Sequence, residues 1–141
     1  MISSLEVIKK LLSSSSNLLQ LAPGGVTIGP ASPADQQKGC IAVAEIESPT
    51  INRYVHSLQA RYTISCVANS LDSSEAIARA VWDYFYGENF FNRKTITQAN
   101  GVTYLVHFLY LTSGPTFRRQ GLNYESLMFA EGMFGIEPVL A

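Results

Sequence analysis

The chain has 141 residues, a net charge of −1 and 15% charged residues. This length suits one ordinary domain, and the near-neutral charge argues against a general electrostatic attraction to nucleic acid or to an anionic membrane. Soluble domains typically carry about 25% charged residues, so the deficit indicates surface that is buried against partner proteins. A surface rich in serine, threonine and asparagine is the alternative explanation.

The longest uncharged stretch, Leu11–Ala34, is interrupted by a serine run, glycines and prolines, so it is not expected to span a membrane. Glu6 precedes Lys9 and Lys10, and no apolar signal-peptide segment follows them. We therefore expect a protein that is made and kept in a cytoplasm.

The first elements are expected to be a helix and two strands. Ser3–Glu6 has the form of a capping box that opens a helix ending near Ser13. The apolar stripe of this helix is Leu5, Ile8, Leu11 and Leu12. Strands are predicted at Val26–Ile28 and Cys40–Glu47, and the polar segment Pro30–Gly39 between them is predicted to be a mobile loop.

The clearest pattern is an alternating strand over Arg53–Ala68. Its apolar face would carry Tyr54, His56, Leu58, Ala60, Tyr62, Ile64, Cys66 and Ala68. At about 3.3 Å per residue the strand would span roughly 53 Å. A globule of this length has a diameter of roughly 37 Å. The strand must therefore bend, break or project, and a hairpin joined through Ser48–Thr50 would form an arm for a neighbouring subunit.

A second helix is predicted over Asp72–Tyr86, with Asp72 as N-cap and Gly87 as C-cap. Its buried face would carry Ala76, Ile77, Ala80, Val81 and Tyr84. A short strand at Thr95–Thr97 and a turn at Asn100–Gly101 follow.

The last part reads as a long hairpin and a tail. Val102–Thr112 is apolar on both faces and is expected to be a central strand. Ser113–Gly121 is expected to be a loop, Leu122–Glu131 a strand, and residues 132–141 a C-terminal tail. The order predicts one α+β domain over residues 1–141. It would hold an antiparallel or mixed sheet of about four to five strands, with two helices packed on one face.

A catalytic or metal-binding constellation is missing from the sequence. His56 and His107 lie in mid-strand, where a histidine is more often a core group than a base. Cys40 and Cys66 lack metal-ligand spacing and are expected to be buried free thiols rather than a disulfide. No glycine-rich phosphate loop precedes a helix. We expect no catalytic residue, no metal and no cofactor, and hence a protein that is not an enzyme.

Two surface features are interface candidates. The first is the expected hairpin loop with Phe117, Arg118, Arg119 and Gln120, because arginine and aromatic residues are enriched at interfaces. These side chains would contribute little to folding. Two solvated arginines are the alternative reading, and two are too few to argue for nucleic-acid binding.

The second feature is the aromatic run Trp82–Tyr86 with Phe90 and Phe91 beyond it. A helix cannot direct all of these rings to one side, so some must face outwards or meet the following loop. Tyr86, Phe90 and Phe91 are therefore candidates for an interface or for a second small cluster. Arg53, where the projecting strand would begin, joins the interface candidates.

The layout of the second half resembles a known family. The relevant segments are Asp72-Ser73-Ser74-Glu75-Ala76, Leu109-Tyr110-Leu111-Thr112-Ser113-Gly114-Pro115, the arginine-bearing turn with Gly121, and Tyr124-Glu125-Ser126-Leu127-Met128-Phe129. Over roughly residues 3–135, the order of elements is similar to that of the bacteriophage tail-terminator and minor-capsid (head–tail joining) proteins.

The resemblance implies a hexameric ring that caps the tail tube, ends its polymerisation and offers a surface for head–tail joining. The implied partners are other copies of the chain, the tail tube protein and the head–tail connector or stopper protein, with DNA only as passing cargo. The implied location is the head-proximal end of the virion tail, assembled in the host cytoplasm. Another neck or tail component, such as a connector or a tube-like subunit, remains an alternative, as does a small cytoplasmic binding module or an enzyme of unrecognised type.

Overall fold

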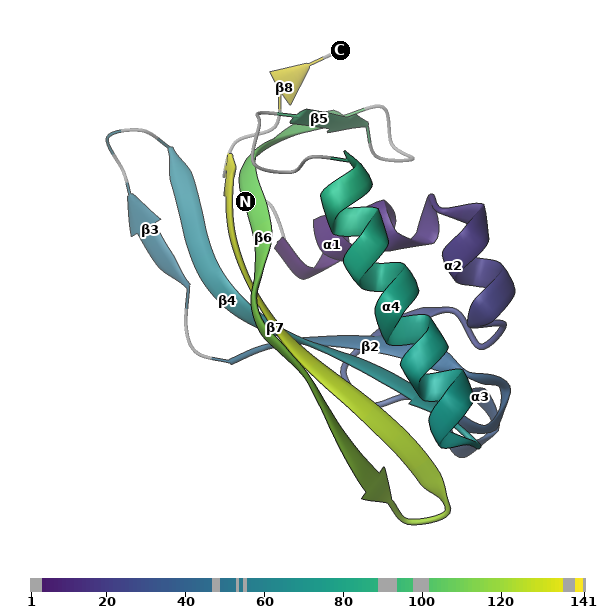
Figure 1. The fold of residues 1–141 in the computed structure, drawn as a ribbon. Coiled ribbons are helices and arrows are strands. Elements are labelled where there is room, and N and C mark those ends of the chain that lie inside the picture. Colours follow the sequence, from purple (N-terminus) through teal and green to yellow (C-terminus); the bar gives the residue numbers. More distant parts are fainter. Residues whose placement is uncertain are drawn as a thin grey trace.

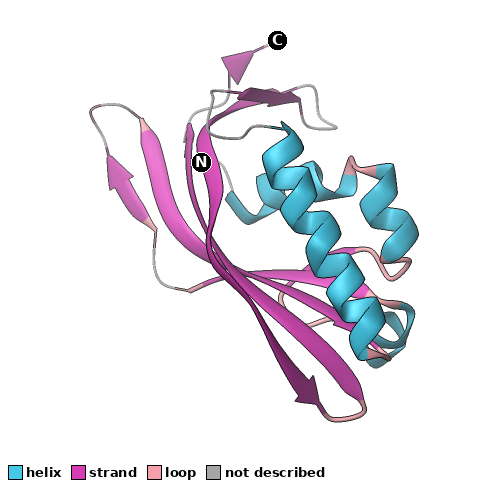
Figure 2. Cartoon of the chain, in the orientation of Figure 1, coloured by secondary structure: helices cyan, strands magenta, loops and turns pink. Residues whose placement is uncertain are grey.

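The computed structural model describes residues 4–46, 49–52, 54, 56–88, 94–97, 102–135 and 139–140. This part of the chain forms a single α+β fold with one eight-stranded sheet and four helices (Figures 1 and 2). The predicted fold class is therefore confirmed, with more strands and more helices than we expected. The predicted capping box at Ser3 and the turn at Asn100–Gly101 lie outside the described residues.

The sheet has the strand order β1-β2-β4-β7-β6-β5. These strands are β1 (Val26–Ile28), β2 (Cys40–Glu45), β4 (Ser57–Ala68), β7 (Asn123–Gly135), β6 (Val102–Gln120) and β5 (Lys94–Thr97). Off this path, β3 (Thr50–Asn52) pairs with β4, and β8 (Val139–Leu140) pairs with β6. The β1–β2 pair is parallel and every other pair is antiparallel, so the sheet is mixed.

Three helices cover one face of the sheet: α1 (Ser4–Ser13), α2 (Ser16–Leu21) and α4 (Leu71–Glu88) (Figure 1). The fourth, α3 (Pro33–Lys38), connects the parallel strands β1 and β2. Its Gln36 lines a cleft with Ala42, Thr63 and Ser65, whose side chains point away from the main core. The two helices that we expected on one face, α1 and α4, are therefore confirmed there, with α2 added beside them and α3 on the other face.

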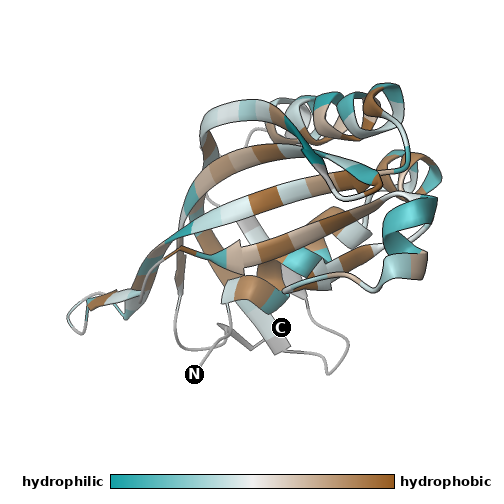
Figure 3. Ribbon diagram, turned by 90° about the horizontal axis from the view of Figure 1, so that it is seen from below, coloured by the Kyte–Doolittle hydropathy of each residue, from teal (hydrophilic) through white to brown (hydrophobic). Residues whose placement is uncertain are grey.

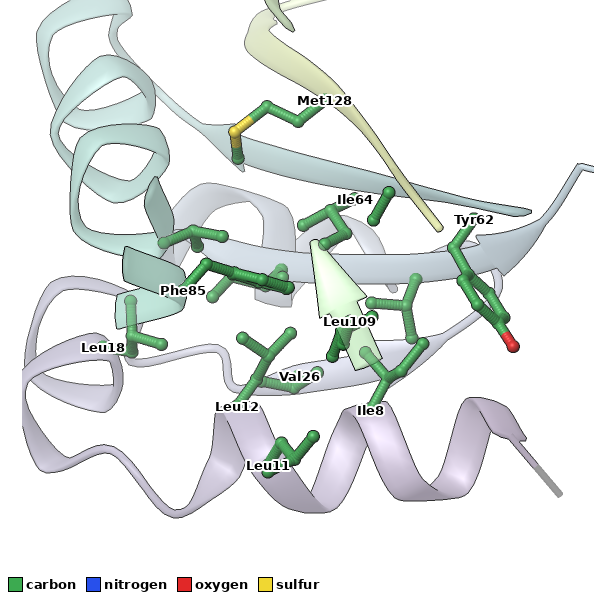
Figure 4. Close-up of a cluster of buried hydrophobic side chains, with 14 of the residues drawn as sticks. Ile8, Leu11, Leu12, Leu18, Val26, Tyr62, Ile64, Phe85, Leu109 and Met128 are labelled. Atoms are coloured by element: carbon green, nitrogen blue, oxygen red, sulfur yellow. The ribbon is translucent and has the colours of Figure 1, made fainter. Parts of the chain in front are cut away.

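The core lies between the three helices and the sheet (Figure 4). The predicted stripe of α1 is confirmed for Ile8, Leu11 and Leu12, while Leu5 packs at its margin. From α4, Ile77 and Val81 are buried as predicted. Ala76, which we placed on this face, is exposed. The strands contribute a further set of fully buried side chains, which includes Tyr62, Ile64, Leu109, Met128 and Phe134.

The expected loop Pro30–Gly39 contains a helix, which corrects the prediction. Ser32 caps α3, because its Oγ accepts a hydrogen bond from the Asp35 amide at 3.2 Å. Pro33 fits the first turn, where the missing N–H costs nothing, and Gly39 ends the helix with a φ of +93°. The helix is short and polar, and none of its residues is buried. Its sequence therefore shows no apolar periodicity.

The ends of α4 also differ from the prediction. Ser70 rather than Asp72 is the N-cap, because its Oγ accepts from the Ser73 amide at 3.2 Å. Asp72 lies in the first turn, where a carboxylate favours the helix dipole. The helix then continues through Gly87 to Glu88.

The predicted strand Arg53–Ala68 breaks into a hairpin. β4 begins only at Ser57, and Ile51 of β3 pairs with Leu58 of β4. His56 lies in the connecting turn with a φ of +49°, and Tyr54 in the same turn is 97% exposed. Both residues therefore leave the apolar face on which the pattern placed them. The hairpin projects from the body of the molecule (Figure 3), which is one of the three outcomes that the length of the pattern allowed.

β6 is much longer than predicted, because the expected loop Ser113–Gly121 is strand as far as Gln120. Its pairing with β7 contains register shifts between Val106 and Phe108, between Leu111 and Ser113, and between Ser113 and Thr116. These irregularities, together with the Gly-Pro pair, hide the strand from a period-two pattern.

The expected C-terminal tail is also corrected, because residues 132–135 belong to β7 and residues 139–140 form β8. Gly132 is buried there, and an added Cβ would meet the Phe134 ring at 2.7 Å. None of the described helices is long and apolar enough to cross a membrane.

Candidate subunit interface

The sheet presents two faces of different character. The helix face carries Leu58, Ile64, Met128 and Phe134 and is covered by α1, α2 and α4. The open face is the opposite side of β4 and β7. It carries Gln59, Arg61, Thr63, Ser65, Leu127, Phe129, Glu131 and Met133, most of them half-buried.

The predicted contact residues Phe117 to Gln120 lie in the last part of β6, next to a turn at Gly121 and Leu122. Because they form a strand, they alternate between the two faces instead of clustering at a loop tip. Phe117 pairs with Ser126 and lies on the helix face, beside α4. Arg118 pairs with Glu125 and lies on the open face. The backbone of Gln120 pairs with Asn123, and its side chain is outside the described residues.

Arg118 is engaged within the chain. Its Nε donates to the Glu125 carboxylate, whose side chain is only 6% exposed. The other carboxylate oxygen accepts a hydrogen bond from Ser65 Oγ at 2.6 Å. A buried carboxylate needs such partners, because an unpaired buried charge is strongly unfavourable. The expectation that both arginines contribute little to folding is therefore revised for Arg118.

Arg119 lies near the turn and is exposed. Its Nε donates to the Gly121 carbonyl at 3.1 Å, and its guanidinium lies 5.9 Å from the centre of the Tyr124 ring. The neighbouring Leu122 is 82% exposed at the tip of the hairpin. A partner can therefore contact Arg119 and Leu122 at this tip without disturbing contacts that stabilise the fold.

The aromatic run of α4 is divided as its helical geometry requires. Phe85 is buried, and the Tyr84 hydroxyl donates to the Leu11 carbonyl at 2.7 Å, which ties α4 to α1. Trp82 is half-buried against the core, and its ring centre lies 5.2 Å from that of Tyr86, which is exposed. Of the other interface candidates, Arg53, Phe90 and Phe91 lie outside the described residues.

A cleft lies between α4 and the far part of β6. It has a volume of about 170 Å³. Its lining residues are Glu75, Ala78, Arg79, Trp82, Pro115 and Phe117. The sequence did not predict this cleft. Pro115 lies beside Trp82 of α4 because β6 continues through residues that we expected to be a loop.

The open face carries a second polar cluster, in which Glu131 is the acceptor. It accepts from Gln59 Nε2 at 2.7 Å and from the Tyr110 hydroxyl at 2.7 Å. The hydrogen bond to Glu131 raises the pKa of Tyr110, and the same bond lowers the pKa of Glu131. These groups stabilise the pairing of neighbouring strands.

The two cysteines are buried free thiols, as predicted. Burial raises the pKa of both thiols and keeps them in the unreactive protonated form. Among the residues that the structure describes, no group of three or more His, Cys, Asp or Glu side chains could hold a metal ion.

The sequence matches no protein-family model and no curated protein. Its fold is similar to that of a chain in a structure described as the virion of a native gene transfer agent particle. The TM-score is 0.61 at 15% sequence identity, over 94% of this chain and 96% of that chain. The two chains thus share a fold over nearly their whole length.

Proposed function

We propose that this chain is a structural virion protein of a phage-like particle and not an enzyme. The observation that carries this proposal is the fold it shares, from end to end, with a chain of a gene transfer agent virion. The match covers both chains almost completely, so the shared fold is not limited to a common substructure.

More specifically, we propose a subunit of a ring, most simply a hexamer, that caps the tail tube and ends its polymerisation. The same ring would offer the surface for the head–tail connector or stopper protein, and DNA would only pass through it. The order of elements supports this role, as does the low content of charged residues. Head-to-tail contacts between identical subunits close into a ring when the rotation from one subunit to the next is a whole fraction of a full turn.

The described side chains support a role without catalysis or a cofactor. The carboxylates of Glu125 and Glu131 form hydrogen bonds and an ion pair with residues on neighbouring strands, so both stabilise the sheet. The exposed apolar groups Tyr54 and Leu122 lie at the tips of two hairpins, where a protein partner can reach them.

The test is removal of the gene from its phage or prophage, with complementation by the wild type or by variants and electron microscopy of the particles. Abnormally long tails, or normal tails unattached to heads, are expected without the protein. Complementation by Leu122→Asp or Arg119→Ala should fail in part, whereas Leu19→Asp, at an exposed position on α2, should complement. Normal infectious particles without the protein would refute the proposal. Purified rings that stack into tubes would instead favour a tube-like subunit.

A further inference from the structure

The sheet has an open edge on one side. β5 and β8 pair with the first part of β6, up to Val106. Beyond it, no described strand pairs with the outer side of Thr112–Gln120, which we call the open edge of β6. The side chains of residues 112–119 are all exposed. An exposed strand edge offers backbone donors and acceptors to any further strand.

The cleft beside α4 lies directly along this open edge, because Pro115 and Phe117 belong to both. It is on the helix face of the sheet, since Phe117 pairs with the buried Ser126 and Trp82 comes from α4. A strand added at this edge would therefore place one of its side chains in the cleft. That side chain must be apolar, because four of the six residues that line the cleft are apolar: Ala78, Trp82, Pro115 and Phe117.

The opposite edge of the same sheet carries a strand of this kind. β3 pairs with β4 on the side away from β7, whereas β6 lies on the other side of β7. All three residues of β3 are exposed, and Ile51 is 44% exposed. Ile51 pairs with the buried Leu58, so it lies on the helix face. β3 is part of the hairpin that projects from the body (Figure 3).

We propose that β3 of one copy pairs with the open edge of β6 in the next copy, with Ile51 seated in the cleft between α4 and Phe117. This inference rests on the ring proposed above and names its subunit contact. β3 is antiparallel to β4, β4 to β7 and β7 to β6, so β3 is itself antiparallel to β6. When β3 adds to β6 of the next copy in this antiparallel sense, the helix faces of the two sheets lie on the same side. Ile51 therefore emerges on the same face as Trp82 and Phe117.

A second copy of the chain is the occupant for three reasons. The two edges lie on opposite sides of one sheet, so each contact leaves the same pair of edges available for the next copy. β3 has the uncharged sequence Thr-Ile-Asn, and the charged residues at the cleft, Glu75 and Arg79, pair with each other at 3.7 Å. Finally, the two segments are similar in length. β3 has three residues, and the part of β6 that pairs regularly with β7 after its last register shift, residues 116–120, is also short.

The test is a cross-link between copies. Ile51→Cys combined with Phe117→Cys is treated with a short bismaleimide, using the free protein over micromolar concentrations and purified particles. The native Cys40 and Cys66 are 0% exposed, so they do not compete for the reagent. The expected result is a ladder of covalent oligomers up to the size of the ring. The control pair, Ile51→Cys with Leu21→Cys on α2, should give none.

Rings or particles that contain the protein but give no ladder would overturn this contact and leave the proposed function standing. Absence of self-association in solution, together with absence from the particles, would overturn both. Ile51→Asp supplies an independent check, because the exposed position keeps the fold while a charge opposes burial in the cleft. We expect self-association to be weakened about tenfold or more. Assembly of this variant at the wild-type level would overturn the contact.

Discussion

Arg118 of β6 and Glu125 of β7 face each other across the hairpin, with the glutamate side chain buried and the arginine side chain more than half exposed. Ser65 of β4 donates to the same carboxylate. One buried charge therefore links three neighbouring strands next to the open edge. Arg118 therefore contributes to the stability of the sheet, whereas Arg119 is an exposed surface residue.

We expect Arg118→Ala to lower the free energy of unfolding by about 1–2 kcal/mol, because it removes one of the two described side-chain donors to a buried carboxylate. Arg119→Ala should change it by less than about 0.5 kcal/mol. Urea unfolding of both variants at neutral pH measures the difference. Equal effects of the two changes would show that Glu125 is reached by water in solution.

The pair of Tyr110 and Glu131 predicts a pH dependence. The pKa of Glu131 is lowered from its usual 4.5, so its stabilisation is present above that value and is lost as the pH falls through the lower folded pKa. The pKa of Tyr110 is raised from its usual 10.0, so its stabilisation is lost as the pH rises through the higher folded pKa.

Tyr110→Phe removes the hydrogen bond responsible for both shifts. We expect the variant to be modestly less stable between about pH 5 and 9, with the difference from the wild type shrinking towards both extremes. Urea midpoints measured from about pH 3 to about pH 11, beyond both ends of this range, provide the test. A difference that stays constant from acid to alkaline pH would show that the bond does not control the two ionisations.

A buried serine pair connects α4 to the sheet. The hydroxyls of Ser74 and Ser126 lie 2.7 Å apart, and Ser74 also donates to the Cys66 carbonyl at 2.8 Å. Ser74→Ala should cost about 1–3 kcal/mol, because it leaves Ser126 and a carbonyl without this partner. The double change with Ser126→Ala should cost less than the sum of the single changes. Strict additivity in thermal or urea unfolding would contradict this coupling.

The core packing gives a direct comparison of the two faces. Ile64→Ala and Leu109→Ala should each cost about 2–5 kcal/mol, because both side chains are buried between the sheet and the helices. Thr63→Ala, next to Ile64 but on the open face, should cost within about 0.5 kcal/mol. A large cost at Thr63 in the assembled particle alone would show that a partner covers the open face.

Elements with a strong apolar period were predictable from the sequence. The stripe of α1 and the alternation of β4 from Leu58 onwards are confirmed, because burial of one face imposes that period. α3 was missed because it buries nothing of its own, and it is held by Ser32 and Gly39. The far part of β6 was missed because its register shifts and its exposed side chains remove the period on which the prediction depends.

The candidate interface was predictable only in part. The segment Phe117–Gln120 was identified by composition, but composition does not distinguish an arginine bound to a buried carboxylate from one that is available to a partner. Pairing residues across a two-residue turn at Gly121 would have placed Arg118 opposite Glu125 and revealed the difference. Ile51 and the cleft could not be found in this way, because they depend on strands and a helix that meet only in the folded chain.

The pairing of β4 with β7 also has a consequence for the order of folding. It joins Ser57 to Gly135 and Ala68 to Tyr124, so the centre of the sheet closes only after most of the chain is available. The β6–β7 hairpin, by contrast, is local in sequence and can form early. Once β6 and β7 have been synthesised, this hairpin would present strand edges on both sides until β4 docks against β7. Slow docking would then favour aggregation through these edges, and low expression temperature should raise the yield of soluble protein.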